Sequence, residues 1–468
     1  MERLFHIQER GSTVRTEIFA GVTTFMAMAY ILMVNAGMFS SLEGQTTYGA
    51  VYIATAISAV IGTLCMALIA NLPLAQASGM GLNAYFVYTI CFGMGLSYAN
   101  ALVLVLIDGI LFTVLTVTGL RKLVFDSIPE EVKAAISAGI GLFIAFIGFQ
   151  NAGLVVASPA TCVTLASFNI FGGNADWATV MPRLVTILGV VMIAVLSYKK
   201  VRGAVLWSIL ASAAAYYLLG LITIPDFYAA NVAPKLTSDF LGAFREFRDF
   251  ALLRVFRDGF DFSAYIQANG MVSFVVMFLT TMLAFCMVDM FDTLGALYST
   301  LQASNMLNRK DDIRSINRAM LSDAIGTTVG AVCGTSTVTT FIESTSGISE
   351  GGRTGFASVI TALLFFLAMF LSPIAQLIPA CATATALVYV GVLMMAGSRN
   401  LDWDDPSKAL PGFLTMAVMV FSYSISNGIA FGLLASVLVK ICIGKVKEIH
   451  PATWVITILF ALTFFLTH

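Results

Sequence analysis

Charge and histidine are both scarce in this sequence. Charged residues make up 11% of the 468 positions and the formal net charge is −1, so the chain lacks the basic surface that nucleic-acid binding requires. The three histidines, His6, His450 and His468, all lie near the ends of the chain. No histidine falls within an apolar segment, which excludes an intramembrane histidine metal site and a membrane protease of the HExxH type.

The sequence also gives little evidence for disulfide bonds or for a catalytic site. The seven cysteines form no CxxC pair, and Cys65, Cys91, Cys286 and Cys442 fall in apolar runs. Cys162 and Cys381 are expected near the outer face, but two such residues make no disulfide framework, so we interpret all seven as small core residues. No GxSxG motif or metal-ligand cluster is present. We therefore predict no catalytic site, no metal site, no cofactor and no enzyme activity.

Apolar residues are abundant instead. They make up 59% of the chain, and the mean hydropathy is +0.90, which is typical of a polytopic all-α membrane protein. Apolar runs long enough to cross a ~30 Å hydrocarbon layer recur from Ile18 to Val446. The first set of predicted segments is 17–40, 48–70, 80–95, 99–120, 134–154, 180–198 and 204–224. The second set is 270–302, 316–332, 341–350, 355–372, 380–397, 411–426 and 428–446.

This pattern predicts about 14 transmembrane segments, about seven in each half. Residues 1–16 then form an N-terminal segment, 17–224 a first repeat, 225–268 an extracytoplasmic loop, and 269–446 a second repeat. Residues 447–468 form an apolar C-terminal segment. Its core, 452–467, is short for a span, so it either lies in the membrane interface or docks on the helix bundle.

Lysine and arginine gather in every second connection between these segments. With a cytoplasmic N-terminus, the same side receives Arg121, Lys122, Lys199, Lys200, Arg202, Arg309, Lys310, Arg314, Arg353, Arg399, Lys408, Lys440, Lys445 and Lys447. The opposite side receives mainly the mixed-charge residues of 225–268, a segment long enough to carry little weight. We therefore predict a multi-pass protein of the plasma or inner membrane with its N-terminus in the cytoplasm.

Two polar, glycine-rich breaks interrupt the apolar pattern. Residues 333–355 read CGTSTVTTFIESTSGISEGGRTG, and residues 76–84 read QASGMGLNA. Irregular backbone at membrane depth must be buried in protein or line a wet cavity. Thr335–Thr340 has strand character and Phe341 begins a short helix, so we predict a strand followed by a half-helix whose N-terminus points at a ligand.

The two breaks occupy the third segment of each half, and an odd number of segments gives the halves opposite orientations in the membrane. A short match, Ser197–Tyr198 before Gly203 and Ser422–Tyr423 before Gly428, also links the ends of the halves. Together these features predict an inverted repeat with short strands in segments 3 and 10, and with the binding site where the two breaks meet.

Six acids are expected at membrane depth, with almost no basic residue at similar depth: Asp108, Asp289, Asp292, Asp323, Glu343 and Glu350. Such acids fit binding of a coupling cation, protonation, or acceptance of ligand N–H groups. Asp289 and Asp292 share one helix face, and Glu343 begins the second half-helix, where the helix dipole favours its charge. Glu350, near Arg353, is interpreted as a solvated loop acid. Asp108 and Asp323 either brace the broken segments or bind directly.

Neutral groups complete the candidate site. The amide of Asn83 has donor and acceptor faces suited to the edge of a heterocycle, and Gly79 and Gly81 allow backbone to come close to it. The predicted substrate contacts are Asn83, Asp289, Glu343, Gly81, Thr339 and Ser336. Proton coupling is assigned to Asp289, Asp292 and Glu343, and a supporting role to Asp323, Asp108, Gly79 and Gln76. With 36 phenylalanines in the chain, no single stacking ring is assigned.

Several motifs resemble one family along essentially the whole chain. They are RTEIFAGVTTFMAMAYILMVN, QASGMGLNAYF, VDMFDTLGAL, AIGTTVGAVCGTSTVTTFIES and GGRTG, in this order. They are similar to the azaguanine/hypoxanthine-permease-like branch of the nucleobase–cation symporter 2 family. The resemblance implies a seven-plus-seven inverted repeat with a core domain (17–120 and 269–372) and a gate domain (134–224 and 380–446). It also implies proton-coupled purine uptake by an elevator-like movement in a homodimer.

In that family, residues that match Asn83, Asp289, Asp292 and Glu343 bind substrate or are needed for transport. The chain departs from the family at Ser78, where proline is usual, and at Thr345, Ser346 and Glu350, where small residues are usual. Asp108 stands where Glu is common. Ser78 adds a hydroxyl beside the site, which leaves the preference among purines open.

The leading hypothesis is therefore a symporter that takes a neutral purine (adenine, guanine or hypoxanthine) inward with a proton. Na⁺ is an alternative coupling ion, because carboxylates and hydroxyls can also coordinate Na⁺. The alternative is an anion or other small-solute transporter or channel on the same fold. An anion site calls for a cation near the half-helix ends or for an uncharged pocket, and the acids argue against it. A membrane-embedded enzyme is the weakest reading, because its motifs are missing.

Overall fold

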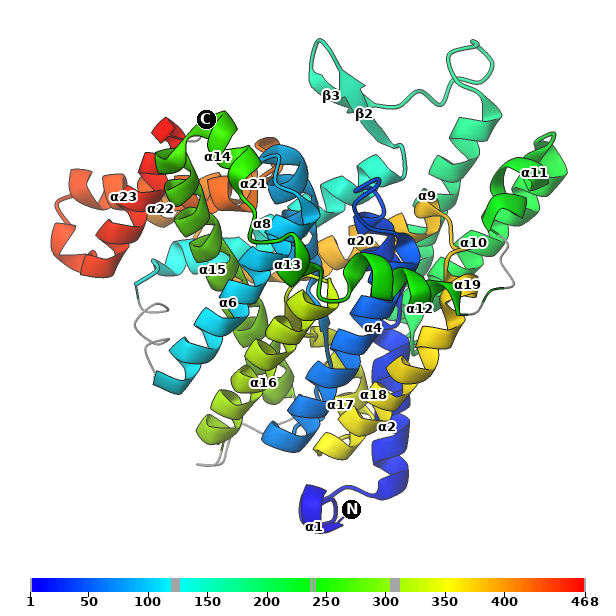
Figure 1. Cartoon of the computed structure of the whole chain (residues 1–468), viewed down its shortest axis with the longest axis horizontal. Helices are drawn as coiled ribbons and strands as arrows, with labels where there is room; N and C mark the ends of the chain where they lie inside the picture. Colours follow the sequence, from blue (N-terminus) through cyan, green and yellow to red (C-terminus); the bar gives the residue numbers. More distant parts are fainter. Residues whose placement is uncertain (1, 119–126, 236–238, 240, 304–311, 467–468) are drawn as a thin grey trace.

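The computed structural model describes residues 2–118, 127–235, 239, 241–303 and 312–466. Arg121, Lys122, Arg309 and Lys310, which enter the predicted orientation, lie outside the described residues. Figure 1 shows a bundle of helices from which the β2–β3 hairpin projects at one edge and helix α1 at the opposite edge.

The first half runs from α1 to α10. Its elements are α1 (Glu2–Phe5), α2 (Val14–Met28), α3 (Tyr30–Phe39), α4 (Tyr48–Cys65), the π-helical turn η1 (Met66–Ala70), β1 (Gln76–Ser78), α5 (Met80–Ala84), the π-helical segment η2 (Tyr85–Gly93), α6 (Tyr98–Thr118), α8 (Glu130–Asn151), β2 (Val155–Ser158), β3 (Cys162–Leu165), α9 (Trp177–Tyr198) and α10 (Ala204–Thr223). The β2–β3 hairpin was not predicted. It follows from the β-branched residues of 155–165, which lie beyond the helix end.

Short helices fold the polar segment between the halves. They are α11 (Phe227–Asn231), η3 (Ala233–Lys235), α12 (Gly242–Glu246), η4 (Phe247–Ala251), α13 (Arg254–Arg257) and α14 (Ser263–Asn269). This segment packs on α4 and α6, and the amide of Asn100 in α6 donates to the carbonyls of Gly259 (2.7 Å) and Asp261 (2.8 Å). The predicted loop is thus a layer of short helices bound to the bundle (Figure 1).

The second half runs from α15 to the C-terminal helix. Its elements are α15 (Met271–Ala303), α16 (Asp312–Cys333), β4 (Val338–Thr340), η6 (Ile342–Ser344), α17 (Thr345–Ser349), α18 (Gly355–Ala368), η7 (Met369–Leu371), α19 (Ser372–Ala375), α20 (Ala380–Met394), η8 (Met395–Asn400), α21 (Pro406–Phe421), α22 (Ile425–Cys442), η9 (Val446–Glu448) and α23 (Pro451–Leu466). Helix α23 packs against α15 and α22, so the C-terminal segment docks on the bundle.

Length and composition identify the membrane-crossing helices. Within the described ranges, ten helices are long and apolar enough to cross a membrane. The other predicted segments are the two half-helices α5–η2 and η6–α17, the more polar α16, and the shorter α21. Apolar side chains such as Val117 (73% exposed), Ile222 (79%) and Phe421 (85%) face outward, which is favourable where the surroundings are lipid tails. The protein is a mostly helical polytopic membrane protein.

The two halves meet at a pair of antiparallel strands, β1 and β4. Gln76 pairs with Thr340, Ala77 with Thr339 and Ser78 with Val338. The strand predicted at 335–340 is therefore shorter than expected, because Thr335 and its neighbours leave the ladder. Each strand is followed at once by a half-helix, so the chain crosses the membrane here as strand plus helix, as the two polar breaks predict.

The same side-chain arrangement holds both strands to the preceding helix. Thr63 of α4 bonds to the N–H and the carbonyl of Gln76, both at 3.0 Å. Thr327 of α16 bonds to the N–H and the carbonyl of Val338, both at 3.1 Å. Each threonine ends an Ile-Gly-Thr sequence, at 61–63 and at 325–327. The two halves therefore repeat the same local structure around the strands.

Glycine brings the two threonine-bearing helices together. A Cβ built on Gly326 would lie 3.5 Å from the Cα of Gly62 and 2.9 Å from Cγ1 of Val338. A Cβ on Gly62 would lie 3.1 Å from Oε1 of Gln76. Helices α4 and α16 thus approach each other and the strands closely at the Ile-Gly-Thr sequences because neither helix carries a side chain there.

Candidate functional site

The candidate site lies where the half-helices begin, next to α15 and α8. The side chain of Thr339 packs against Gly79, where an added Cβ would be 2.8 Å from its Oγ1. Gly81, in the first turn of α5, faces two other helices. A Cβ there would lie 2.6 Å from Cγ2 of Ile140 in α8 and 3.7 Å from Oδ2 of Asp292 in α15. Because Gly79 and Gly81 have no side chains, Thr339 of β4 and Asp292 of α15 can lie close to the backbone at the start of α5.

Two half-buried carboxylates lie at the starts of the two half-helices. Asp292 lies beside Gly81 of α5. Glu343, in the first turn of η6, accepts a hydrogen bond of 2.7 Å from the hydroxyl of Tyr30. Within the part of the chain that the structure describes, neither acid has a lysine or arginine within ion-pair distance. The positive ends of helix dipoles favour negative charge at such positions, so both acids are suited to accept ligand N–H groups.

Asp289 lies one helical turn before Asp292 on α15 and is fully buried. The two residues share a helix face, as their spacing predicts. Ser336, between α16 and β4, is also fully buried, and its hydroxyl has no hydrogen-bond partner among the described residues. The structure therefore places Gly81, Asp292 and Gly79 together, with Glu343 at the second half-helix, Asp289 one turn deeper along α15, and Ser336 before β4.

Asn83 belongs to a buried chain of hydrogen bonds that reaches across the bundle. Its Oδ1 accepts from the hydroxyl of Ser78 (2.7 Å), and its Nδ2 donates to the carbonyl of Ser78 (3.4 Å). The Ser78 hydroxyl lies 3.1 Å from that of Thr335. Thr335 accepts from Asn35 (2.9 Å), which also donates to Thr55 (2.7 Å). Residues from α3, α4, β1 and the segment before β4 are thereby held together.

A second buried network surrounds Asp323 in α16. Its Oδ1 accepts hydrogen bonds from Nε2 of Gln76 (3.1 Å) and from Thr340 (3.3 Å), and its Oδ2 accepts from Thr293 (2.6 Å). Asp323 therefore contacts both strands and α15. Asp108 of α6, fully buried as well, lies close enough to Asp323 for the two carboxylates to interact electrostatically.

Several of these residues were not singled out in the sequence. Tyr30 and Asn35 lie in the apolar run 17–40, and Thr335 was assigned only to a strand. Polar side chains inside a membrane segment are a signal of function or packing, and Tyr30 and Asn35 carry that signal. Their partners, however, are 313 and 300 residues away in the sequence, so no local pattern identifies the contact.

Glu350 follows α17 at a partly exposed position, and its ion-pair partner is not the neighbouring Arg353. Both of its carboxylate oxygens accept from the guanidinium of Arg202, which lies between α9 and α10. Arg353 instead donates to the carbonyls of Ile348 (2.8 Å) and Gly352 (2.7 Å). The reason is geometric, because Arg353 turns back onto its own loop and leaves Glu350 facing the other half-repeat.

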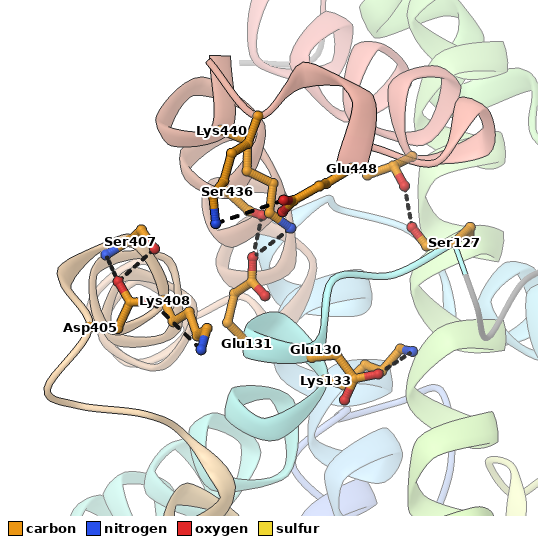
Figure 2. Close-up of polar contacts among 12 residues, drawn as sticks. Ser127, Glu130, Glu131, Lys133, Asp405, Ser407, Lys408, Ser436, Lys440 and Glu448 are labelled. Atoms are coloured by element: carbon orange, nitrogen blue, oxygen red, sulfur yellow. Dashed lines mark hydrogen bonds and ion pairs between the residues drawn. The ribbon is translucent and has the colours of Figure 1, made fainter. Parts of the chain in front are cut away.

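A cavity of about 220 Å³ lies elsewhere, between α8, α22 and the start of α23. Figure 2 shows that its charged groups face one another. Glu131 accepts from Ser436 (2.6 Å) and pairs with Lys440 (3.1 Å), and Thr453 bonds to the carbonyl of Ser127. Because these contacts join α8, α22 and α23, we interpret the cavity as part of the docking of α23.

Asp405, at the start of α21, shows a clear effect of its surroundings. Asp405 precedes α21 and accepts from the hydroxyl (2.6 Å) and the backbone N–H (3.0 Å) of Ser407 (Figure 2). These hydrogen bonds hold the pKa of Asp405 below its usual range. Asp405 thus acts as a charged N-cap of α21.

Comparison with known proteins gives matches along nearly the whole chain. A sequence profile described as "Permease family" matches residues 15–431. The guanine/hypoxanthine permease PbuG of Bacillus subtilis is 37% identical over 472 residues, covering 99% of each chain. The adenine permease AdeP of Escherichia coli is 34% identical over 462 residues, covering 99% of this chain and 95% of its own.

A solved structure supports the fold. The transmembrane domain of the cyanobacterial bicarbonate transporter BicA superposes with a TM-score of 0.61, covering 88% of this chain and 97% of its own, at 17% sequence identity. This likeness shows the fold alone. It agrees with the strand pair and the repeated threonine contacts, so the architecture is the inverted repeat of seven plus seven segments.

Proposed function

Because the chain belongs to the nucleobase–cation symporter 2 family of permeases, we propose that it is a secondary transporter that imports purine nucleobases. Adenine, guanine and hypoxanthine are the proposed substrates, since the names of PbuG and AdeP cover these three bases. As a permease, the protein moves its substrate without converting it.

The observation that carries this proposal is the pair of carboxylates at the half-helix ends. Asp292 beside Gly81 and Glu343 beside Tyr30 present acceptor oxygens toward the region where the two half-helices begin. A neutral purine carries ring and exocyclic N–H donors, which carboxylates accept with charge-assisted hydrogen bonds. We propose that Glu343 accepts one of these donors, and that Asp289 and Asp292 act from α15.

Asn83 has a more specific role in this proposal. The structure records a contact of its Nδ2 with the Ser78 carbonyl at 3.4 Å, and an amide nitrogen has two hydrogens. We propose that the second hydrogen serves the purine edge, while Ser78 holds the amide oxygen. Gly79 and Gly81 supply close backbone, and Thr339 and Ser336 supply hydroxyl groups.

We further propose that the purine enters together with a proton. Asp289, Asp292 and Glu343 are the candidates for its transfer, because burial of a carboxyl group stabilises its neutral form. A neutral purine and one proton together carry one positive charge inward, so a membrane potential that is negative inside would also drive uptake. Na⁺ coupling is the alternative outcome of the experiment below.

An anion transporter is the rival on the same fold. An anion at a half-helix N-terminus is stabilised by free backbone N–H groups and is opposed by a carboxylate at the same place. Asp292 and Glu343 occupy these places, and within the described ranges no lysine or arginine pairs with them. A neutral ligand with N–H groups fits this charge distribution better than an anion does.

An elevator-like movement in a homodimer is the proposed transport mechanism. The core would consist of 17–120 and 269–372, and the gate of 134–224 and 380–446. Packing supports this division, since α16 packs on α4 and α6, and α18 on α2 and α4, while α20 packs on α8 and α9, and α21 on α8 and α22. The N-terminus would face the cytoplasm of a cell whose plasma or inner membrane holds the protein.

The experiment is uptake of radiolabelled adenine, guanine and hypoxanthine into proteoliposomes with an imposed pH or Na⁺ gradient. We expect pH-driven uptake by the wild type. In Glu343→Gln and Asp289→Asn, the loss of a charge-assisted hydrogen bond worth about 1.5–3 kcal/mol predicts uptake about 10- to 150-fold weaker.

The control is Asp404→Asn, at an exposed position between η8 and α21, which we expect to transport as the wild type does. Absence of purine uptake under either gradient by correctly folded and inserted protein would contradict the substrate class. Uptake driven only by Na⁺ would replace the proton as the coupling ion.

A further inference from the structure

The surroundings of Asp323 stabilise the ionised form of its carboxyl group. It is fully buried, and three hydrogen-bond donors from Gln76, Thr293 and Thr340 reach its two oxygens. Hydrogen bonds to a carboxylate stabilise the ionised form. These donors come from β1, β4 and α15, the elements that carry the candidate site.

Asp108 is just as buried as Asp323 but lacks its hydrogen-bond donors. Its side chain is fully buried in α6, and neither of its oxygens has a hydrogen-bond partner among the described residues. The helix is pressed against α16 at this depth, because a Cβ on Gly109 would lie 2.6 Å from Oγ1 of Thr328. Among the described residues, the ionisable group that interacts with Asp108 is Asp323.

These surroundings assign different protonation states to the two acids. An ionised carboxylate buried without donors and next to a second negative charge is destabilised by several kcal/mol. A protonated Asp108 beside an ionised Asp323 avoids that penalty. Two carboxyl groups whose charges interact titrate as a coupled pair.

We infer that Asp108 and Asp323 together form a proton-binding site of the transport cycle, behind the strands and separate from the carboxylates that face the purine. The inference rests on the proposed transport function. Proton uptake converts the Asp108 carboxylate and one H⁺ into a neutral carboxylic acid, and release reverses this step, so no other reactant is needed.

The network explains how this site communicates with the purine. Thr293 donates to Asp323 and directly follows Asp292, which lies beside Gly81. Gln76 and Thr340 donate to Asp323 from the two strands that lead into the half-helices. Loss of the proton leaves two negative charges next to these contacts. A change that alters the binding free energy of both the proton and the purine couples the binding of the two.

The test uses Asp108→Asn in the full-length protein, because asparagine has the shape of a protonated aspartate and cannot release a proton. Proteoliposomes containing a pH-sensitive dye report purine-driven proton entry, and purine exchange at equal internal and external pH reports binding and movement without coupling. For Asp108→Asn we expect exchange within about twofold of the wild type, with proton entry and pH-driven accumulation reduced about tenfold or more. Asp404→Asn is the matched surface control.

Two results would overturn this assignment. One is wild-type proton entry in Asp108→Asn, and the other is loss of exchange together with proton entry in folded protein, which would make Asp108 a structural residue. Failure of the wild type itself to transport purine is a different result, because it contradicts the proposed function before the variant is compared.

Discussion

At Ser78, a single hydroxyl decides how a buried amide is oriented. The hydroxyl donates to Oδ1 of Asn83 and lies within hydrogen-bond distance of Thr335. Proline, the residue that the family resemblance leads one to expect here, has no such donor. In this chain the orientation of the Asn83 amide in α5 therefore depends on Ser78 of β1 and not only on the ligand.

Ser78→Ala tests that dependence. The substitution leaves the Asn83 oxygen without its donor in a fully buried place, which costs about 1–3 kcal/mol, and we expect a lower thermal unfolding temperature. Ser41→Ala removes a hydroxyl from an exposed position after α3 and is expected to change stability by less than about 0.5 kcal/mol. Equal unfolding temperatures for Ser78→Ala and the wild type in detergent would contradict this account.

Residue-level prediction from the sequence reached the acids and glycines but not their partners. The spacing of Asp289 and Asp292 and the position of Glu343 at a half-helix start followed from local rules. The contacts of Glu343 with Tyr30 and of Glu350 with Arg202 join residues 313 and 148 positions apart. Such contacts depend on how the halves pack, and a single sequence contains no local pattern for that.

At the scale of elements, the close approach of α4 and α16 depends on two glycines. Gly326→Ala places a methyl group 2.9 Å from Cγ1 of Val338, against a strand that two hydrogen bonds of Thr327 hold in place. Overpacking of this kind costs about 1–3 kcal/mol, so we expect a lower unfolding temperature and weaker purine transport.

Gly37→Ala in α3 is the matched control, because nothing lies within 4 Å of the added Cβ. Alanine has a better helix propensity than glycine by about 1 kcal/mol, so this variant is expected to be as stable as the wild type or more stable. Unaltered stability and transport in Gly326→Ala would contradict this account, because it would show that α4 and α16 can move apart without affecting either property.

Elements were the most predictable level of this fold. The two polar breaks indicated a strand and half-helix in each half, and the structure confirms both. The Ile-Gly-Thr sequences at 61–63 and 325–327 are a signal of the repeat that sequence reading overlooked, because a three-residue match has no meaning until both threonines are seen to bind a strand. The β2–β3 hairpin was missed because its residues were read only as a connection.

On the scale of the whole molecule, the ion pair of Arg202 and Glu350 joins the two groups of helices that the elevator proposal separates. Arg202 lies between α9 and α10, whereas Glu350 follows α17. The arginine and glutamate side chains are 54% and 26% exposed, and a pair this accessible contributes about 0–1 kcal/mol to stability. Its larger effect would fall on the balance between transport states.

Glu350→Gln tests this effect. We expect an almost unchanged unfolding temperature with a transport rate altered about twofold or more, because a difference of about 0.5 kcal/mol between two states changes their ratio about twofold. Asp402→Asn, which breaks the exposed contact with Lys408, serves as control. Identical initial rates for Glu350→Gln, Asp402→Asn and wild type would contradict the role of the pair.

The pairing of β1 with β4 also constrains how the protein is made. The N–H of Gly79 bonds to the carbonyl of Thr337, and the N–H of Phe341 bonds to the carbonyl of Ala75, both at 3.0 Å. Lipid offers no replacement for these partners, so the carbonyl of Ala75 and the N–H of Gly79 lack them while the first strand leaves the ribosome and enters the membrane. Water or the insertion machinery must supply hydrogen-bond partners for these groups until the second strand, which ends at residue 340 of 468, has been synthesised.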